Sequence, residues 1–115
     1  MSKLRRNALR FQAAYYIATG SLPLVSRGTF EKITGRKQDW WLVQMVGLLA
    51  LTAGVTIAIG TRKKRTSPEI LTLSTMSAAS FAYIDTVHAL SGRISEIYLL
   101  DAVLEIALIG TIARG

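Results

Sequence analysis

One long uncharged segment constrains this chain more than any other feature. From Trp40 to Thr61 the sequence carries no charged side chain. Its length exceeds the ~20 residues that an α-helix needs to cross the hydrocarbon core of a bilayer. The run MVGLLALTAGVTIAIG within it has no polar face beyond Thr52 and Thr56, whereas a helix of a soluble bundle is polar along one side. The segment therefore predicts a membrane-spanning helix and disfavours the alternative, a soluble four-helix bundle.

Three further apolar segments accompany this one. Residues 11–26 are uncharged, whereas residues 70–90 and 97–113 are long enough to span a bilayer but are interrupted by acids. The sequence Ser67-Pro68-Glu69 is typical of a helix start, with a capping hydroxyl, a proline and an acid at the positive end of the helix dipole. We therefore expect an all-α fold and a single integral membrane domain over residues 1–115. Its four transmembrane helices form two antiparallel hairpins and cover about residues 9–26, 40–60, 69–90 and 96–113.

The connection between the first two of these helices, RGTFEKITGRKQD, carries the apolar residues Phe30 and Ile33. We expect it to hold a short turn at the membrane interface around Phe30 and Ile33. The adjacent Trp40 and Trp41 fit the belt of aromatic residues that lies at such an interface.

The basic residues lie in short clusters between the apolar segments. The chain has 14 Lys+Arg against 7 Asp+Glu, which gives a net charge of +7. A nucleic-acid-binding module would place such residues along one helix face or among exposed aromatics, so we expect no nucleic-acid partner. Nine Lys and Arg residues fall on the side of the N-terminus and five on the opposite side. An excess of Lys and Arg marks the cytoplasmic side, and both termini are therefore expected in the cytoplasm.

The third and fourth expected helices carry acids within their apolar sequence. Counting outward from Arg93 in the tight turn between them, Asp85 and Asp101 lie at the same depth, and Glu105 lies one helical turn deeper. Steps of three and four residues along each helix direct these acids toward a common seam. The candidate ligand- or proton-binding residues are Asp85, His88, Tyr98, Asp101 and Glu105, with support from Tyr15, Tyr16, Gln44 and Arg93.

Acids inside a bilayer need compensation, because each charge costs at least ~2.5–3.5 kcal/mol there. Two ionised carboxylates at one depth would repel each other in a poorly screened medium. We therefore expect Asp85 and Asp101 to hold at least one proton near neutral pH, unless a cation is bound. The alternative is a purely structural, hydrogen-bonded polar clasp between helices. Ionisable residues within membranes are by default functional, which favours a binding site.

Metal and cofactor chemistry finds little support. The Asp85-x-x-His88 spacing is half of the pattern in carboxylate-bridged di-iron bundles, which need a second such motif and further carboxylates. The absence of cysteine excludes thiol redox chemistry and cysteine-ligated zinc. The sequence also has no phosphate-binding loop, nucleophile elbow or dinucleotide fingerprint. We expect no resident cofactor and no metal.

Small residues recur one turn apart on two of the expected helices. The third helix contains Ser74-xxx-Ala78-xxx-Ala82, and the second contains Ala50-xxx-Gly54. Such patterns let helix backbones approach closely in lipid. They exceed what one hairpin contact needs, so we expect a homo-oligomer.

Three sequence features together resemble a group of known proteins. They are the Gly20-x-x-Pro23 pattern in the first helix, the second-helix sequence WWLVQMVGLLALTAG and the fourth-helix sequence YLLDAVLE from Tyr98 to Glu105. With the four-helix layout, these are similar to small, uncharacterised bacterial membrane proteins of the DoxX-like group. The resemblance implies a four-helix membrane fold in the plasma (inner) membrane and no particular activity.

Three classes of function remain open, and the third involves no chemical reaction or transport. In the first, a small transporter or channel subunit binds a proton, a cation or a cationic small molecule at the acids. In the second, an enzyme acts on a lipid-soluble substrate, with an acid and His88 as proton donor and acceptor. The third is an accessory subunit whose polar seam docks onto a larger membrane complex.

Overall fold

The chain is entirely helical in the part that the structure describes. This structure is a computed structural model and describes residues 2–35, 39–92 and 94–114. No strand occurs within these residues, which confirms the expected all-α class. The helices in chain order are α1 (Lys3–Val25), α2 (Arg27–Thr34), α3 (Trp40–Gly60), α4 (Pro68–Leu90) and α5 (Ile97–Arg114).

Two differences from the expected helices have local causes. Helix α1 begins at Lys3 rather than near residue 9, because the side chain of Ser2 accepts a hydrogen bond from the Arg5 amide and caps a basic first turn. The turn expected around Phe30 is a full helix, α2. Ser26 separates α1 from α2, since its backbone amide donates to Leu22 while its hydroxyl caps the Thr29 amide at 3.2 Å. The expected turn is therefore a fifth helix.

Helices α1 and α3 pack with their backbones in close contact. A Cβ atom on Gly20 would lie 2.5 Å from the Gly47 carbonyl oxygen, and one on Gly54 would lie 2.9 Å from the Ala13 carbonyl oxygen. Neither distance is compatible with a side chain, so the glycines set the separation of the two helices. The absence of side chains at these points permits the close approach that is typical of helices in lipid.

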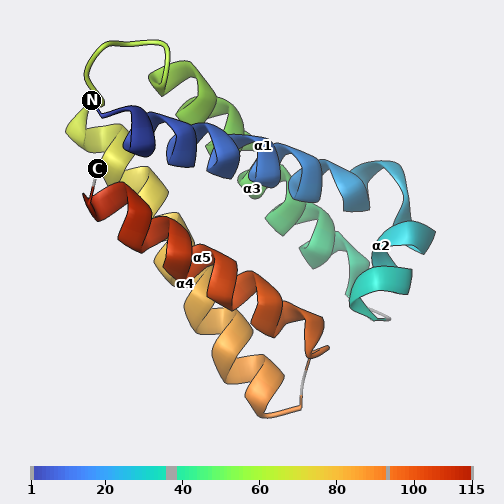
Figure 1. The fold of residues 1–115 in the computed structure, drawn as a ribbon. Coiled ribbons are helices and arrows are strands. Elements are labelled where there is room, and N and C mark those ends of the chain that lie inside the picture. Colours follow the sequence, from blue (N-terminus) through green and yellow to red (C-terminus); the bar gives the residue numbers. More distant parts are fainter. Residues whose placement is uncertain (1, 36–38, 93, 115) are drawn as a thin grey trace.

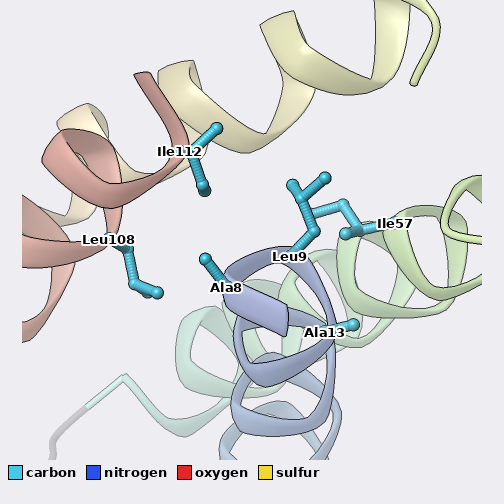
Figure 2. Packing of buried hydrophobic residues seen from close by; sticks show 6 residues of the cluster. All are labelled: Ala8, Leu9, Ala13, Ile57, Leu108 and Ile112. Carbon is cyan, nitrogen blue, oxygen red and sulfur yellow. The ribbon is translucent and has the colours of Figure 1, made fainter. Parts of the chain in front are cut away.

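A small apolar core joins α1 and α3 to α5. Its members are small or aliphatic, and Figure 2 shows Leu108 and Ile112 of α5 pointing toward the side of α1 that carries Ala8. Leu9 of the same helix lies beside Ile57 of α3. The buried core residues are Ala8, Leu9, Ala13, Ile57, Leu108 and Ile112.

The same end of the molecule brings together both termini and the connection from α3 to α4 (Figure 1). Arg5 Nε donates a 2.8 Å hydrogen bond to the carbonyl oxygen of Ile112, near the C-terminal end of α5. Carbonyls in the last turn of a helix have no partner within that helix, and a cation there also favours the helix dipole. Arg6 bonds the Lys63 carbonyl oxygen at 3.4 Å. Basic side chains thus hold three parts of the chain together at this end.

The outer surface of the long helices is rich in large apolar side chains. Helices α3 and α4 are each long and apolar enough to cross a membrane, judged by length and composition, and their best windows are only 22% buried. Most of the surface of these two helices is therefore not enclosed by the rest of the chain. The exposed large apolar residues of α3, α4 and α5 include Leu42, Met45, Leu48, Leu49, Ile59, Met76, Ile84, Leu90, Leu100, Val103 and Ile106.

Candidate functional site

Gln12 of α1 forms the first layer of a polar network inside the helix assembly. Its side chain is fully buried. The Nε2 atom donates to the Ser74 carbonyl oxygen at 3.0 Å and to the Tyr16 hydroxyl at 3.1 Å. In return, the Ser74 hydroxyl donates to Gln12 Oε1. This reciprocal pair fixes α1 against α4 and satisfies a buried amide that would otherwise be costly.

Tyr16 connects this layer to α5. Its hydroxyl accepts from Gln12 and donates to Oε1 of Glu105 at 2.7 Å. Tyr16 and Glu105 are each only 1% exposed. The ring of Tyr16 also meets the ring of Phe81 edge to face, with centroids 5.3 Å apart. One tyrosine therefore contacts α4 through its ring and α5 through its hydroxyl.

Tyr15 makes the corresponding contact with the next acid along α5. Its hydroxyl donates to Oδ1 of Asp101. Both residues are half-buried, and the Phe11 ring stacks against Tyr15 with an interplanar angle of 7°. Consecutive tyrosines on α1 thus serve two acids that are one turn apart on α5.

Asp85 of α4 completes the acidic cluster, defined here as Asp85, Asp101 and Glu105. Its side chain is 4% exposed, and its carboxyl group lies within hydrogen-bonding reach of Asp101. The charged groups that act on it are Asp101 and Glu105, both acidic. Ionised carboxylates only accept hydrogen bonds, so this pair forms a bond only when one of them holds a proton.

The second oxygen of Asp85 is the exceptional atom of the cluster. Oδ2 is buried and has no hydrogen-bond partner among the described residues. In contrast, Asp101 and Glu105 each accept a bond from a tyrosine. A buried carboxyl oxygen without a donor is costly. The arrangement therefore favours either a proton on this carboxyl group or a cation beside it.

The structure brings together some of the residues expected at the site and not others. Asp85 and Asp101 are adjacent, as counting outward from the turn predicts, and both acids act electrostatically on Tyr98, which lies three residues before Asp101 on α5. Tyr98 also shares a hydrogen bond with Thr34 of α2. His88 is half-buried one turn beyond Asp85.

Two of the supporting residues do not join the cluster in the described structure. Gln44 is exposed on α3, one turn before Gly47, which packs against the Gly20 and Pro23 end of α1. It therefore lies beyond the level of Tyr16. Arg93 falls outside the described residues.

The sequence contained a signal for Gln12 and Ser74, the two residues of this network that it did not assign to the site. Gln12 and Tyr16 are separated by four residues, so they lie on one face of α1. Ser74 begins the small-residue pattern of α4, where its hydroxyl has a bonding role as well as a packing one. A glutamine in an otherwise apolar helix needs polar partners when it is buried. The presence of Gln12 in the first apolar segment was therefore the signal that a polar network lies there.

The chemistry of the cluster is that of oxygen acids and hydroxyl donors. Among the described residues, no three His, Cys, Asp or Glu side chains are arranged to hold a metal ion. The groups present can accept, hold and donate protons, and together they can neutralise a positive charge.

Comparison with known proteins adds no relationship to this picture. No family model, no curated protein and no solved structure matches the chain. The resemblance to DoxX-like proteins therefore stays an expectation from the sequence.

Proposed function

We propose that this chain is a multi-pass membrane protein in which the acidic cluster binds a proton or another cation within the bilayer. The distribution of polarity supports the membrane location. Large apolar side chains cover the outside of α3, α4 and α5, while Gln12, Ser74 and Glu105 are buried. Soluble proteins bury apolar side chains and seldom enclose such acids. In lipid, polar side chains instead face the interior of the helix assembly.

In this proposal α1, α3, α4 and α5 all cross the bilayer as two antiparallel hairpins. Helix α2 lies at the interface, where Arg27 stacks over the Trp40 ring at 4.8 Å and pairs with Glu31 at 3.3 Å. The basic residues support cytoplasmic termini. Among the described residues, the end with both termini carries Lys3, Arg5, Arg6, Arg10, Arg62, Lys63, Lys64, Arg65 and Arg114, whereas the opposite end carries Arg27 and Lys32.

The unpaired Oδ2 of Asp85 is the observation that carries the binding function. A structural clasp would be expected to satisfy all of its members, as the tyrosine bonds satisfy Asp101 and Glu105. Oδ2 of Asp85 instead has no hydrogen-bond partner among the described residues, and the charges of Asp101 and Glu105 that act on Asp85 are both acidic. Its carboxyl group therefore gains from a proton or cation that the rest of the cluster does not supply. A transporter or a channel subunit uses a site of this kind.

One observation favours a second candidate, an enzyme that acts on a lipid-soluble substrate. A groove of about 890 Å³ lies between α3 and α4 and is open along its outer side. A lateral opening suits a substrate that arrives from lipid, and Glu105 with Tyr16 would supply a proton acceptor and donor. Turnover of a lipid-soluble compound with no flux of protons would favour this candidate over transport.

Proton flux in liposomes tests the proposed function. A pH gradient is imposed across vesicles that contain the protein and a pH-sensitive dye, with potassium and valinomycin to dissipate charge. The wild type should collapse the gradient faster than empty vesicles, and Asp85→Asn should remove this excess. The matched control Glu96→Gln makes the same chemical change at an exposed position and should retain it. Equal rates for the wild type and empty vesicles would reject the function.

A further inference from the structure

The groove between α3 and α4 has the size and lining of a binding site for a small molecule. Its volume of about 890 Å³ falls within the ~300–1,000 Å³ that is typical of ligand pockets. Aliphatic side chains dominate the wall, including Val46 and Leu49 of α3 and Met76 of α4. The polar residues of the lining all belong to α4 and are Glu69, Thr72, Ser77 and Ser80. An occupant must therefore present a mainly apolar body.

The inner end of this groove borders the acidic cluster. Phe81 lines the groove, and its ring packs edge to face on Tyr16, whose hydroxyl bonds Glu105. Asp85 follows Phe81 by one turn on the same helix. Two aromatic rings thus separate the apolar groove from three carboxyl groups.

The charge behind these rings selects the sign of the ligand. An anion would be repelled by Asp85, Asp101 and Glu105, and a small hydrated cation would leave the apolar groove unfilled. Aromatic faces attract organic cations, with Trp, Tyr and Phe as the usual partners. An apolar body, an aromatic boundary and a negative interior are together complementary to a lipophilic organic cation.

We propose that a lipophilic organic cation binds with its apolar body in the groove between α3 and α4 and its positive charge directed past Phe81 toward Asp85. This inference rests on the proposed function, because it identifies the cation as one that enters from the lipid phase. The cation and the proton compete for the same carboxyl groups. Bound cation therefore displaces a proton, and its affinity falls as the pH falls. The titratable groups on other helices that interact electrostatically with Asp85 are Tyr15 from α1, and Tyr98, Asp101 and Glu105 from α5.

Binding of tetraphenylphosphonium to the protein in phosphatidylcholine nanodiscs tests this proposal, with empty nanodiscs as the background. Ser80→Phe fills the groove, and Ala79→Phe makes a comparable enlargement at the adjacent exposed position outside it. Ser80→Phe and Asp85→Asn should each weaken binding at least about tenfold, or ~1.4 kcal/mol. Ala79→Phe should match the wild type, and tetramethylammonium, which lacks the apolar body, should bind far more weakly.

The outcomes separate this proposal from the broader function. Wild-type binding no greater than that of empty nanodiscs, or unchanged binding in Ser80→Phe, overturns the ligand and its location. Tetraphenylphosphonium binding that Ser80→Phe removes but Asp85→Asn preserves overturns the direction of the positive charge toward Asp85 and leaves the groove as a site for apolar molecules. If the ligand fails while Asp85-dependent proton flux persists, the proposed function stands. Proton flux in Ser80→Phe and Ala79→Phe also shows that both variants are folded, and Asp101→Asn provides a second carboxyl variant if Asp85→Asn unfolds.

Discussion

The hydroxyl of Tyr16 donates a 2.7 Å hydrogen bond to Glu105 at a point where both side chains are almost completely buried. This bond crosses from the first long helix to the last. Because Tyr16 also accepts from Gln12, which in turn bonds Ser74, a continuous polar path links α4, α1 and α5. The same residues therefore stabilise the helix assembly and shape the environment of the acidic cluster.

Removing this hydroxyl should destabilise the protein. Tyr16→Phe leaves Glu105 without its tyrosine donor and should cost about 1–3 kcal/mol, the range for a buried group that loses its partner. The measurement is thermal or denaturant unfolding in a mild detergent. Tyr83→Phe is the matched control, since Tyr83 is 66% exposed, and should change stability little. Equal effects of the two substitutions would contradict a structural role for the bond.

The close approach of α1 and α3 predicts an asymmetric response to alanine. Gly20→Ala places a methyl group 2.5 Å from the Gly47 carbonyl oxygen and should destabilise the fold by about 1–3 kcal/mol through overpacking. Gly110→Ala adds the same methyl group where no described atom lies within 4 Å. It should be neutral or stabilising by up to about 1 kcal/mol, because alanine favours the helix. The measurement is the free energy of unfolding of both variants under one set of conditions. A Gly20→Ala variant as stable as the wild type would show that α1 and α3 lie farther apart.

Cysteine labelling tests the orientation in the membrane. The natural chain has no cysteine, so single substitutions report without background. With cytoplasmic termini, an impermeant maleimide applied to intact cells should label Ser91→Cys in the turn between α4 and α5 and leave Lys63→Cys unlabelled. Permeabilised cells should label both. The reverse pattern in intact cells would place the termini outside.

The acids of α5 should differ from each other in function. Asp101→Asn keeps an oxygen acceptor for Tyr15, so its stability should stay within about 0.5 kcal/mol of the wild type, as for a substitution that breaks no buried network. Proton flux should nevertheless be lost, because the amide cannot share a proton with Asp85. Glu105→Gln, one turn away, should reduce flux less. Unchanged flux in Asp101→Asn would leave the acidic cluster as a structural clasp.

The sequence predicted the long helices, apart from the start of α1, because the length of an uncharged run and the helix start signals are local features. The start of α3 at Trp40 and of α4 at Pro68 follow from an uncharged run and from Ser67-Pro68-Glu69. The pairing of Asp85 with Asp101 also followed, since a tight turn fixes the relative depth of two antiparallel helices. Helix α2 was harder to predict from the sequence, because its eight residues depend on the Ser26 cap and on packing against Trp40.

The sequence patterns of single helices did not predict which face of α1 packs against α4 and α5. The partners of Gln12 come from α4 and α1 itself, and the tyrosine bonds reach α5. No local pattern specifies which faces meet across such distances in sequence. For the same reason Gln44, a polar residue in an apolar helix like Gln12, was expected near the acids but is exposed.

The small residues of α3 and α4 pack within one copy of the chain, whereas their sequence pattern predicted contacts between copies. Gly54 and Ala50 of α3 pack against α1, and Ser74 and Ala78 of α4 are completely buried within the chain. These residues are therefore used by a single copy. A homo-oligomer stays a prediction from the sequence, and it would need to use other surfaces, such as the exposed apolar faces of α4 and α5.

The most direct test of the central claim is the infrared spectrum of the protein in lipid at neutral pH. A protonated carboxyl group has a carbonyl stretching band that an ionised one lacks, and its shift in heavy water identifies an exchangeable proton. The account predicts this band in the wild type, its loss in Asp85→Asn and its retention in the exposed control Glu96→Gln. A spectrum without the band and without a bound cation, or one that Asp85→Asn leaves unchanged, would contradict a proton held between Asp85 and Asp101.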